Sequence, residues 1–359
     1  MSFYQALRAG TIQATLIVAI PRSVSSALAL SLSLSPDIDL HLYEPFYEIK
    51  RPTRLWGRVL DRQAEKKSAT VEKPLRFVMK ALANTVSAPR FRNLINHSER
   101  ICTLVRDPQS QALSALRAIH ENPSGEEASI GELRRLKWRD EINHDVKKYI
   151  IKPWQSMKSH LDALSASLEE QRNWCVVEGD LIRVNPETAL KRLCEGLHMA
   201  YSDEMVNGLD GAHEKTVGLQ ERGYGESWVG RAQYSKTLEK PTAMTPSLEN
   251  FSDGVRPHIE ANLRIYVWAL SSAHALKPQP DELKTLMREG GFHLTCPIAC
   301  YTLARLWPDA VADERARVLT GIRKELPQYV SSFDIIDAAE VMRPSEPDYS
   351  ETQLLRAVP

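Results

Sequence analysis

Residues 15–31, TLIVAIPRSVSSALALS, join a short apolar run through Pro-Arg-Ser to small residues that are compatible with a helix. A continuous apolar run of this kind is typical of a strand buried on both faces of a parallel sheet. The next helix should begin near Ser25, so the free N–H groups of its first turn and the Arg22 guanidinium would point at the loop. The segment therefore predicts a phosphate-binding strand, loop and helix; the alternative is a plain turn with a serine N-cap.

The rest of the chain alternates strand-like and helix-like stretches. Further strands are expected at residues 38–46, 75–80, 101–105 and 174–181, and a helix is expected to begin near Pro186. Strands that alternate with helices form a parallel sheet with right-handed crossover connections. We therefore expect an α/β fold in which a P-loop-like parallel sheet is flanked by helices.

A second turn from strand to helix carries Arg106-Asp107-Pro108, ahead of a helix rich in alanine and leucine. An arginine can hold a phosphate through two N–H groups, and Ser114 presents a hydroxyl about two turns along that helix. The alternative is a local ion pair between Arg106 and Asp107, with Asp107 as the helix cap.

Together these segments resemble the PAPS-dependent sulfotransferases, above all bacterial and fungal sulfotransferase-like proteins; PAPS is 3′-phosphoadenosine 5′-phosphosulfate. The first loop is similar to the family's 5′-phosphosulfate loop, Pro-(Lys/Arg)-Ser-Gly-(Ser/Thr)-(Ser/Thr), except that Val24 replaces the glycine. Further matches are Glu-Pro-Phe at residues 44–46 and the spacing from Arg106 to Ser114. Glycine tolerates a positive φ, which a β-branched residue resists, so Val24 is the main departure.

This resemblance covers residues 11–272 and implies a sulfotransferase fold that uses PAPS as co-substrate, releases 3′,5′-ADP and needs no metal. The residues that it assigns to the phosphosulfate are Pro21, Arg22, Ser23, Val24, Ser25 and Ser26. It assigns Arg106 and Ser114 to the 3′-phosphate. Arg222, in a loose echo of a glycine-rich family segment, is a further candidate ligand or a residue of an ordinary surface loop.

Sulfuryl transfer needs a base for the acceptor and a cation near the leaving oxygen. Arg22 and Lys80 are the candidate cations. Glu44 follows a strand at the carboxyl edge of the sheet, where ligands bind in open α/β folds, and related sulfotransferases use a glutamate at a similar distance as general base. In the alternative, Glu44 is part of the scaffold and pairs with Arg51 or Arg54.

Two histidines are the remaining candidates for the base. His41 lies in the same expected strand as Glu44, three positions before it, so strict alternation places the two side chains on opposite sides. His97 is expected instead to cap the end of a helix. Among His293, Cys296 and Cys300 a fourth metal ligand is missing, so these side chains are expected to pack within helices.

Composition favours a cytoplasmic globular enzyme. The 46 Lys and Arg residues balance 46 Asp and Glu residues, so neither nucleic acid nor an anionic membrane is expected as a partner. The first apolar run is only about seven residues long, whereas a helix that spans a membrane needs about 20. Five cysteines without a Cys-x-x-Cys pair indicate reduced thiols.

We expect an α/β domain at residues 11–272, with a helical insertion at 121–170 over the acceptor cleft. A C-terminal helical module should follow at 273–345 and an extended tail at 346–359. The apolar faces of the module would pack against the sheet or form a homodimer contact.

The expected function is PAPS-dependent sulfation of a hydroxyl or amine of a small molecule, for example in secondary metabolism. The alternative is a non-catalytic or divergent protein that binds a nucleotide or anion on the same fold.

Overall fold

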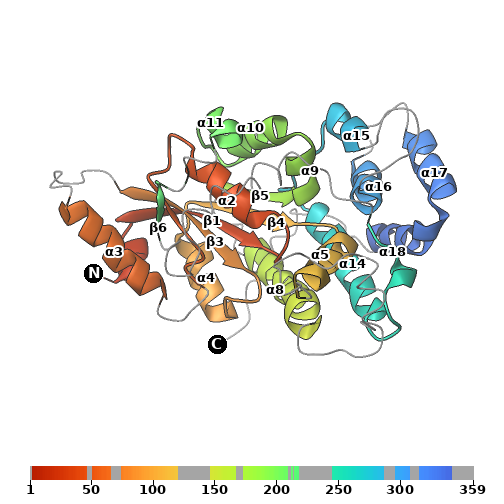
Figure 1. Cartoon of the computed structure of the whole chain (residues 1–359), viewed down its shortest axis with the longest axis horizontal. Coiled ribbons are helices and arrows are strands. Elements are labelled where there is room, and N and C mark those ends of the chain that lie inside the picture. Colours follow the sequence, from red (N-terminus) through yellow and green to blue (C-terminus); the bar gives the residue numbers. More distant parts are fainter. Residues whose placement is uncertain are drawn as a thin grey trace, which may run out of the picture.

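A computed structural model describes most of the chain (Figure 1). The described residues are 2–46, 51–65, 74–119, 146–166, 173–208, 212, 214–217, 245–286, 296–307 and 315–341. Arg222, His293 and the tail at 346–359 lie outside them, as does the first part of the expected insertion.

A six-stranded parallel sheet forms the centre of the described structure, with strand order β5-β4-β1-β3-β2-β6. Its strands are β1 (Ile12–Ala19), β2 (Leu40–Leu42), β3 (Leu75–Leu82), β4 (Arg100–Val105), β5 (Asn173–Glu178) and β6 (Thr216–Val217). The predicted fold class, a parallel α/β sheet flanked by helices, is confirmed.

Helices follow nearly every strand. The helices that precede β5 in the sequence are α1 (Phe3–Arg8), α2 (Ser25–Ser33), α3 (Arg51–Glu65), α4 (Ala88–His97), α5 (Pro108–Ile119) and α8 (Lys152–Ala166). After β5 come α9 (Gly179–Val184), α10 (Pro186–Gly196), α11 (Glu204–Asn207) and α14 (Arg256–Leu270). The C-terminal extension contains α15 (Pro280–Leu286), α16 (Pro297–Leu306), α17 (Arg315–Glu325) and α18 (Val330–Val341).

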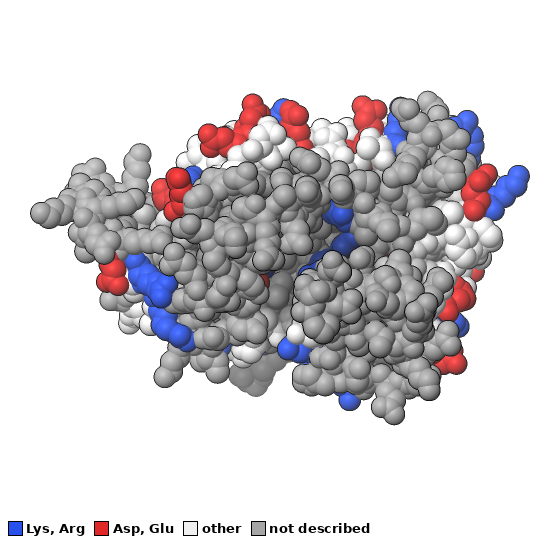
Figure 2. Space-filling view, in the orientation of Figure 1, with Lys and Arg blue, Asp and Glu red and all other residues white. Residues whose placement is uncertain are grey.

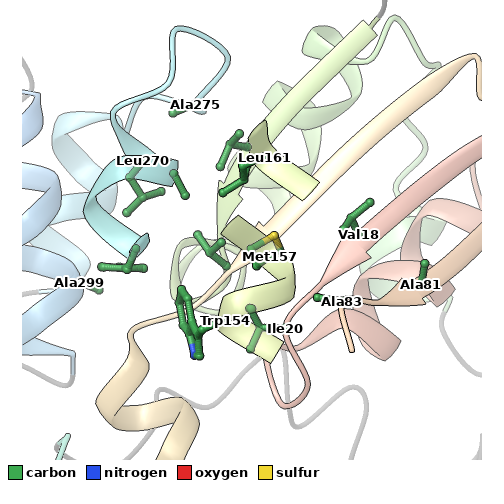
Figure 3. Close-up of a cluster of buried hydrophobic side chains, with 14 of the residues drawn as sticks. Val18, Ile20, Ala81, Ala83, Trp154, Met157, Leu161, Leu270, Ala275 and Ala299 are labelled. Atoms are coloured by element: carbon green, nitrogen blue, oxygen red, sulfur yellow. The ribbon is translucent and has the colours of Figure 1, made fainter. Parts of the chain in front are cut away.

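Alternate side chains of β1 enter two different apolar cores. Val18 and Ile20 pack with Trp154 and Met157 of α8 on one face of the sheet (Figure 3). Ile17 and Ala19 pack under α2 and α10 on the other face. Because both faces are covered, the strand reads as a continuous apolar run, and it holds the loop that follows β1 between two helical layers.

The structure departs from the expected element limits by one or two residues at β3 and β4, and by more in three other places. β2 covers only Leu40–Leu42 of the expected 38–46, because the backbone turns at Glu44, where φ is +43°. The strand expected at 174–181 ends at Glu178, whose carboxylate accepts hydrogen bonds from the N–H groups of Asp180 and Leu181 and so starts α9. The two-residue strand β6 was not predicted, since two residues carry no periodic signal.

Helices continue beyond residue 272, as predicted, and α18 packs against α14 (Figure 1). The proposed domain limits and the homodimer contact stay predictions. In the part of the chain that the structure describes, every helix is too short or too polar to cross a lipid bilayer.

Candidate anion-binding site

The loop between β1 and α2, residues 21–26, has an unusual backbone. Arg22 and Val24 both have φ of +67°, and Ser23 between them does not have a positive φ. Alternation in the sign of φ turns successive N–H groups toward the same side, which makes a concave site for an anion. The Ser23 hydroxyl donates to the carbonyl oxygen of Ile20 at 2.6 Å and so fixes the turn instead of facing a ligand.

The first turn of α2 faces this loop and carries no side-chain cap. Its N-cap is Val24, which has no hydrogen-bonding side chain, and the helix begins at Ser25 as predicted. The N–H groups of the first turn, together with the positive end of the helix dipole, make this helix start suitable for binding an anion. Glycine 179 lies behind the loop: a Cβ at that position would stand 3.0 Å from the carbonyl oxygen of Ser23. Sequence reasoning missed Gly179, and a glycine directly after a strand was the available signal.

Lys80, Glu44 and Ser26 meet at the mouth of the loop. Lys80 is paired with Ile17 in the sheet register, so its side chain lies on the α2 face. Its Nζ donates to Ser26 Oγ at 2.7 Å and to Glu44 Oε1 at 2.8 Å. The Lys80 side chain is 4% exposed and that of Glu44 is 13% exposed, so this ion pair is largely removed from water while Glu44 stays accessible. The structure thus brings the predicted base together with one predicted cation.

Arg22 reaches in the other direction, toward the second predicted motif. Its Nε donates to Ser114 Oγ of α5 at 3.1 Å. Arg106 donates from Nη1 to the carbonyl oxygen of Arg22 at 3.2 Å, and its Nε lies 3.4 Å from Asp180 Oδ1. Two turns that are 84 residues apart in the sequence therefore lie side by side.

The two arginines differ in their exposure to solvent. Arg106 is buried, whereas the Arg22 side chain is exposed. Burial opposes the charge of Arg106, but Asp180 and the neighbouring acidic groups raise its pKa overall, so Arg106 stays a cation. The exposed guanidinium next to Ser114 is that of Arg22.

Asp107 and Glu178 hold the backbone around these arginines. Asp107 caps α5 by accepting from the N–H groups of Gln109 and Ser110 at 2.9 and 3.1 Å, as one interpretation of the sequence expected. Glu178 accepts from the N–H of Asp107 at 3.3 Å in addition to those of α9. Burial raises the pKa of both carboxyl groups, and neighbouring Asp180 raises them further.

Gln111 is a second residue that sequence reasoning missed. Its Nε2 donates to the carbonyl oxygen of Pro21 at 3.1 Å and to that of Tyr149 at 3.0 Å. Trp154 Nε1 donates to its Oε1 at 3.3 Å. This buried amide fixes the start of the loop to α5 and α8, and no local sequence signal marks a contact across 90 residues.

The two histidines lie elsewhere. His41 is buried in β2, and its Nδ1 lies 3.2 Å from Thr216 Oγ1 of β6. Burial and the nearby charge of Lys80 lower the pKa of His41 to about 3, so the ring is neutral. Because β2 ends at Leu42, the expected alternation does not extend to Glu44. His97 is the last residue of α4, just ahead of β4, and therefore lies at the amino edge of the sheet.

Among the described residues, no group of three His, Cys, Asp or Glu side chains is arranged to hold a metal ion. Cys296 and Cys300 are buried at the start of α16. Figure 2 shows Lys and Arg side chains inside a hollow near the middle of one face, over α5, α9 and the carboxyl end of β4. The two turns meet at this carboxyl edge of the sheet, where they follow β1 and β4.

No family model matches the chain, and no curated protein matches it. Among solved structures, it is similar to a mouse sulfotransferase complexed with PAP, at 15% identity and a TM-score of 0.35, over 59% of this chain and 67% of that one. The sulfotransferase domain from the curacin biosynthetic pathway gives 14% identity and a TM-score of 0.34, over 70% and 98%. A sulfotransferase from Mycobacterium tuberculosis gives 10% identity and a TM-score of 0.32, over 65% and 79%.

Proposed function

We propose that this protein is a sulfotransferase that moves a sulfuryl group from PAPS to a hydroxyl or amine of a small-molecule acceptor. The observation that carries the proposal is the position of Lys80, whose Nζ bonds both to Ser26 in the uncapped first turn of α2 and to Glu44. An anion site, a cation and an accessible carboxylate are then adjacent. These are the groups that sulfuryl transfer requires.

The β1–α2 loop suits the 5′-phosphosulfate. Its alternating backbone and the first turn of α2 present N–H donors, and Lys80 adds a positive charge that is buried enough to act strongly. Ser25 and Ser26 are at the start of the helix, where their hydroxyls can supplement the backbone donors. The family resemblance of Pro21–Ser26 and the geometry of the loop thus favour the same ligand.

In the transfer step, Glu44 takes the proton of the acceptor as the acceptor oxygen or nitrogen forms its bond to sulfur. The bond from sulfur to the bridging oxygen breaks, and its electron pair stays on the 5′-phosphate, next to the Lys80 ammonium. The products are the sulfated acceptor and 3′,5′-ADP. Lys80 therefore serves two purposes: it holds Glu44 in place before the reaction, and it stabilises the charge that develops on the leaving oxygen.

The exposed arginine is proposed to bind the 3′-phosphate. Arg22 Nε lies 3.1 Å from Ser114 Oγ, so a phosphate at this point would meet a guanidinium and a hydroxyl together. Buried Arg106 then acts partly through Arg22, because it bonds to the Arg22 carbonyl oxygen and pairs with Asp180. This refines the sequence-based assignment, which placed Arg22 on the phosphosulfate and Arg106 on the 3′-phosphate.

The proposal is tested by incubating the protein with PAPS that carries a labelled sulfuryl group and a panel of phenols, alcohols and amines. Label should appear on at least one acceptor, and 3′,5′-ADP should raise the melting temperature of the protein in a parallel assay. The absence of both transfer and stabilisation would refute the proposal.

A non-catalytic nucleotide-binding protein on the same fold is the second candidate, and Val24 favours it. A β-branched side chain at a φ of +67° occupies the position where a glycine would let the backbone approach an anion most closely. Stabilisation by 3′,5′-ADP without transfer to any acceptor would favour this second function.

A further inference from the structure

Two segments from the C-terminal part of the chain bond directly to the start of α5. The first is residues 245–246, and the second is the beginning of α18, where Ser332 bonds to Gln109. Tyr329, in the 3-10 turn just ahead of α18, bonds to the first segment. Both reach the residues that directly follow Arg106. We call Thr245, Pro246, Tyr329 and Ser332 the C-terminal brace.

One half of the brace acts on Gln109. Its amide is fully buried, and both ends of it are used: Nε2 donates to the carbonyl oxygen of Pro246 and Oε1 accepts from Ser332 Oγ at 2.8 Å. A buried amide that loses one of these partners is left with an unsatisfied polar atom, which is costly. The orientation of Gln109, and with it the first turn of α5, therefore depends on α18.

The other half acts on Asp107. Thr245 Oγ1 donates to Asp107 Oδ2 at 3.0 Å and lies 2.7 Å from Ser110 Oγ, which also bonds to Asp107. The Tyr329 hydroxyl in turn donates to the carbonyl oxygen of Thr245. Because these side chains are all buried, the contacts form a closed polar network around the helix cap.

This network lies between Arg106, which bonds to the Arg22 carbonyl oxygen, and Ser114, which is proposed to bind the 3′-phosphate together with Arg22. Arg106 directly precedes Asp107, and Ser114 is on the same helix that Asp107 caps. A small rotation or shift of the first turn of α5 would move Arg106 relative to the Arg22 carbonyl and Ser114 relative to the Arg22 guanidinium. The N–H groups proposed to face the 5′-phosphosulfate include those of the first turn of α2, to which no brace residue bonds in the part of the chain that the structure describes.

We propose that the C-terminal brace positions Arg106 and Ser114, and that the C-terminal helices are therefore part of the 3′-phosphate subsite. The brace residues are positioning residues, since they act through α5. This inference rests on the proposed function, because it assumes that the site binds a nucleotide with a 3′-phosphate.

The test compares Ser332→Ala and Tyr329→Phe with two matched controls. Ser331→Ala removes the adjacent serine, which is exposed and bonds to Glu249 instead. Tyr301→Phe removes a buried tyrosine hydroxyl that bonds to Asp337, within the C-terminal helices. For each protein the Kd of 3′,5′-ADP and of 5′-AMP is measured by calorimetry, together with the melting temperature.

The two brace variants should bind 3′,5′-ADP on the order of 10-fold more weakly, and 5′-AMP should lose less affinity, because a shift of α5 moves Ser114 directly but reaches the first turn of α2 indirectly, through the bonds of Arg106 and Gln111 to the loop. The control variants should bind both nucleotides like the wild type. General structural damage would instead weaken the binding of both nucleotides by the same factor, and that result would overturn the positioning role.

Two further outcomes are decisive and can be told apart. If the wild type binds 3′,5′-ADP and both brace variants bind it equally well, the brace inference fails while the proposed function stands. If the wild type binds no 3′,5′-ADP, the proposed function fails, and the role given to the brace fails with it. Tyr329→Phe keeps the bond between Ser332 and the buried Gln109 amide, so it decides the matter even if Ser332→Ala folds poorly.

Discussion

At the scale of single residues, Val24 shows how the loop keeps its shape without glycine. Its backbone has φ of +67° and ψ of +10°, a left-handed conformation that costs an L-residue about 1–2 kcal/mol. Other contacts hold the loop in this conformation, because Ser23 and Gln111 donate hydrogen bonds to the carbonyl oxygens of Ile20 and Pro21, just ahead of Val24. The sequence identified Val24 as a departure, but it did not indicate that the backbone would adopt the same conformation as glycine.

Replacement of Val24 by Gly and by Ala separates this strain from packing. Both variants lose the valine side chain, so their difference reports the backbone. We expect Val24→Gly to be more stable than Val24→Ala by about 1 kcal/mol in the free energy of unfolding, measured with urea. At Ala29, inside α2, Ala→Gly should instead destabilise by about 1 kcal/mol. If the glycine form were less stable than the alanine form at both positions, the left-handed backbone at Val24 would be contradicted.

Glu44 is the residue on which the chemistry depends. We expect Glu44→Gln to lower kcat by roughly 10²- to 10⁴-fold, because a positioned base is lost, and to leave 3′,5′-ADP affinity intact, because Lys80 remains. The loss should be smaller with acidic phenols, which ionise with less help. Glu99→Gln, at the opposite edge of the sheet in an ion pair with Arg100, is the matched control and should retain activity. An equal loss for all acceptors would make Glu44 part of the scaffold.

At the scale of elements, sequence prediction succeeded where burial leaves a continuous signal. β1, β4 and β5 each contain a short, largely apolar run, and Pro186 marks the start of α10 as expected. Sequence prediction failed for β6, which is held in place by pairing with β2 and by the contact of Thr216 with His41. The meeting of Arg22 with Ser114 could be anticipated from the parallel sheet, but the pairing of Lys80 with Glu44 and the bonds of Gln111 depend on side-chain packing between distant segments.

The buried histidines should make the elements around them sensitive to acid. Burial lowers the pKa of His41 to about 3 and that of His160, which stacks on Phe91 between α8 and α4, to about 4. The unfolded chain therefore binds these protons below about pH 6.5, whereas the folded protein does not, and stability falls as the pH is lowered from there toward 4.

Each histidine should contribute up to about 1.4 kcal/mol per pH unit to this loss. Urea unfolding of His41→Asn and His160→Gln between pH 7 and pH 4.5 should show a shallower dependence on pH than the wild type. Unchanged slopes in both variants would mean that these rings take up protons in the folded state.

At the scale of the whole molecule, the site gathers residues from most of the chain. The loop lies between the N-terminal strand and α2, Ser114 is on α5 and Asp180 is on α9. The brace combines residues 245–246 with Tyr329 and Ser332, near the end of the described chain. The two motif turns are held by buried polar contacts instead of by local sequence, so no single segment could form the site alone. The central claim is that these turns form one nucleotide site.

The most direct measurement of that claim is the Kd of 3′,5′-ADP for the wild type and for Arg22→Ala, by calorimetric titration. We expect one site per chain in the wild type and an affinity about 10- to 100-fold weaker in Arg22→Ala, because a charge-assisted contact to a phosphate contributes about 1.5–3 kcal/mol. Equal affinity in a folded Arg22→Ala variant, or no binding to the wild type, would contradict the account.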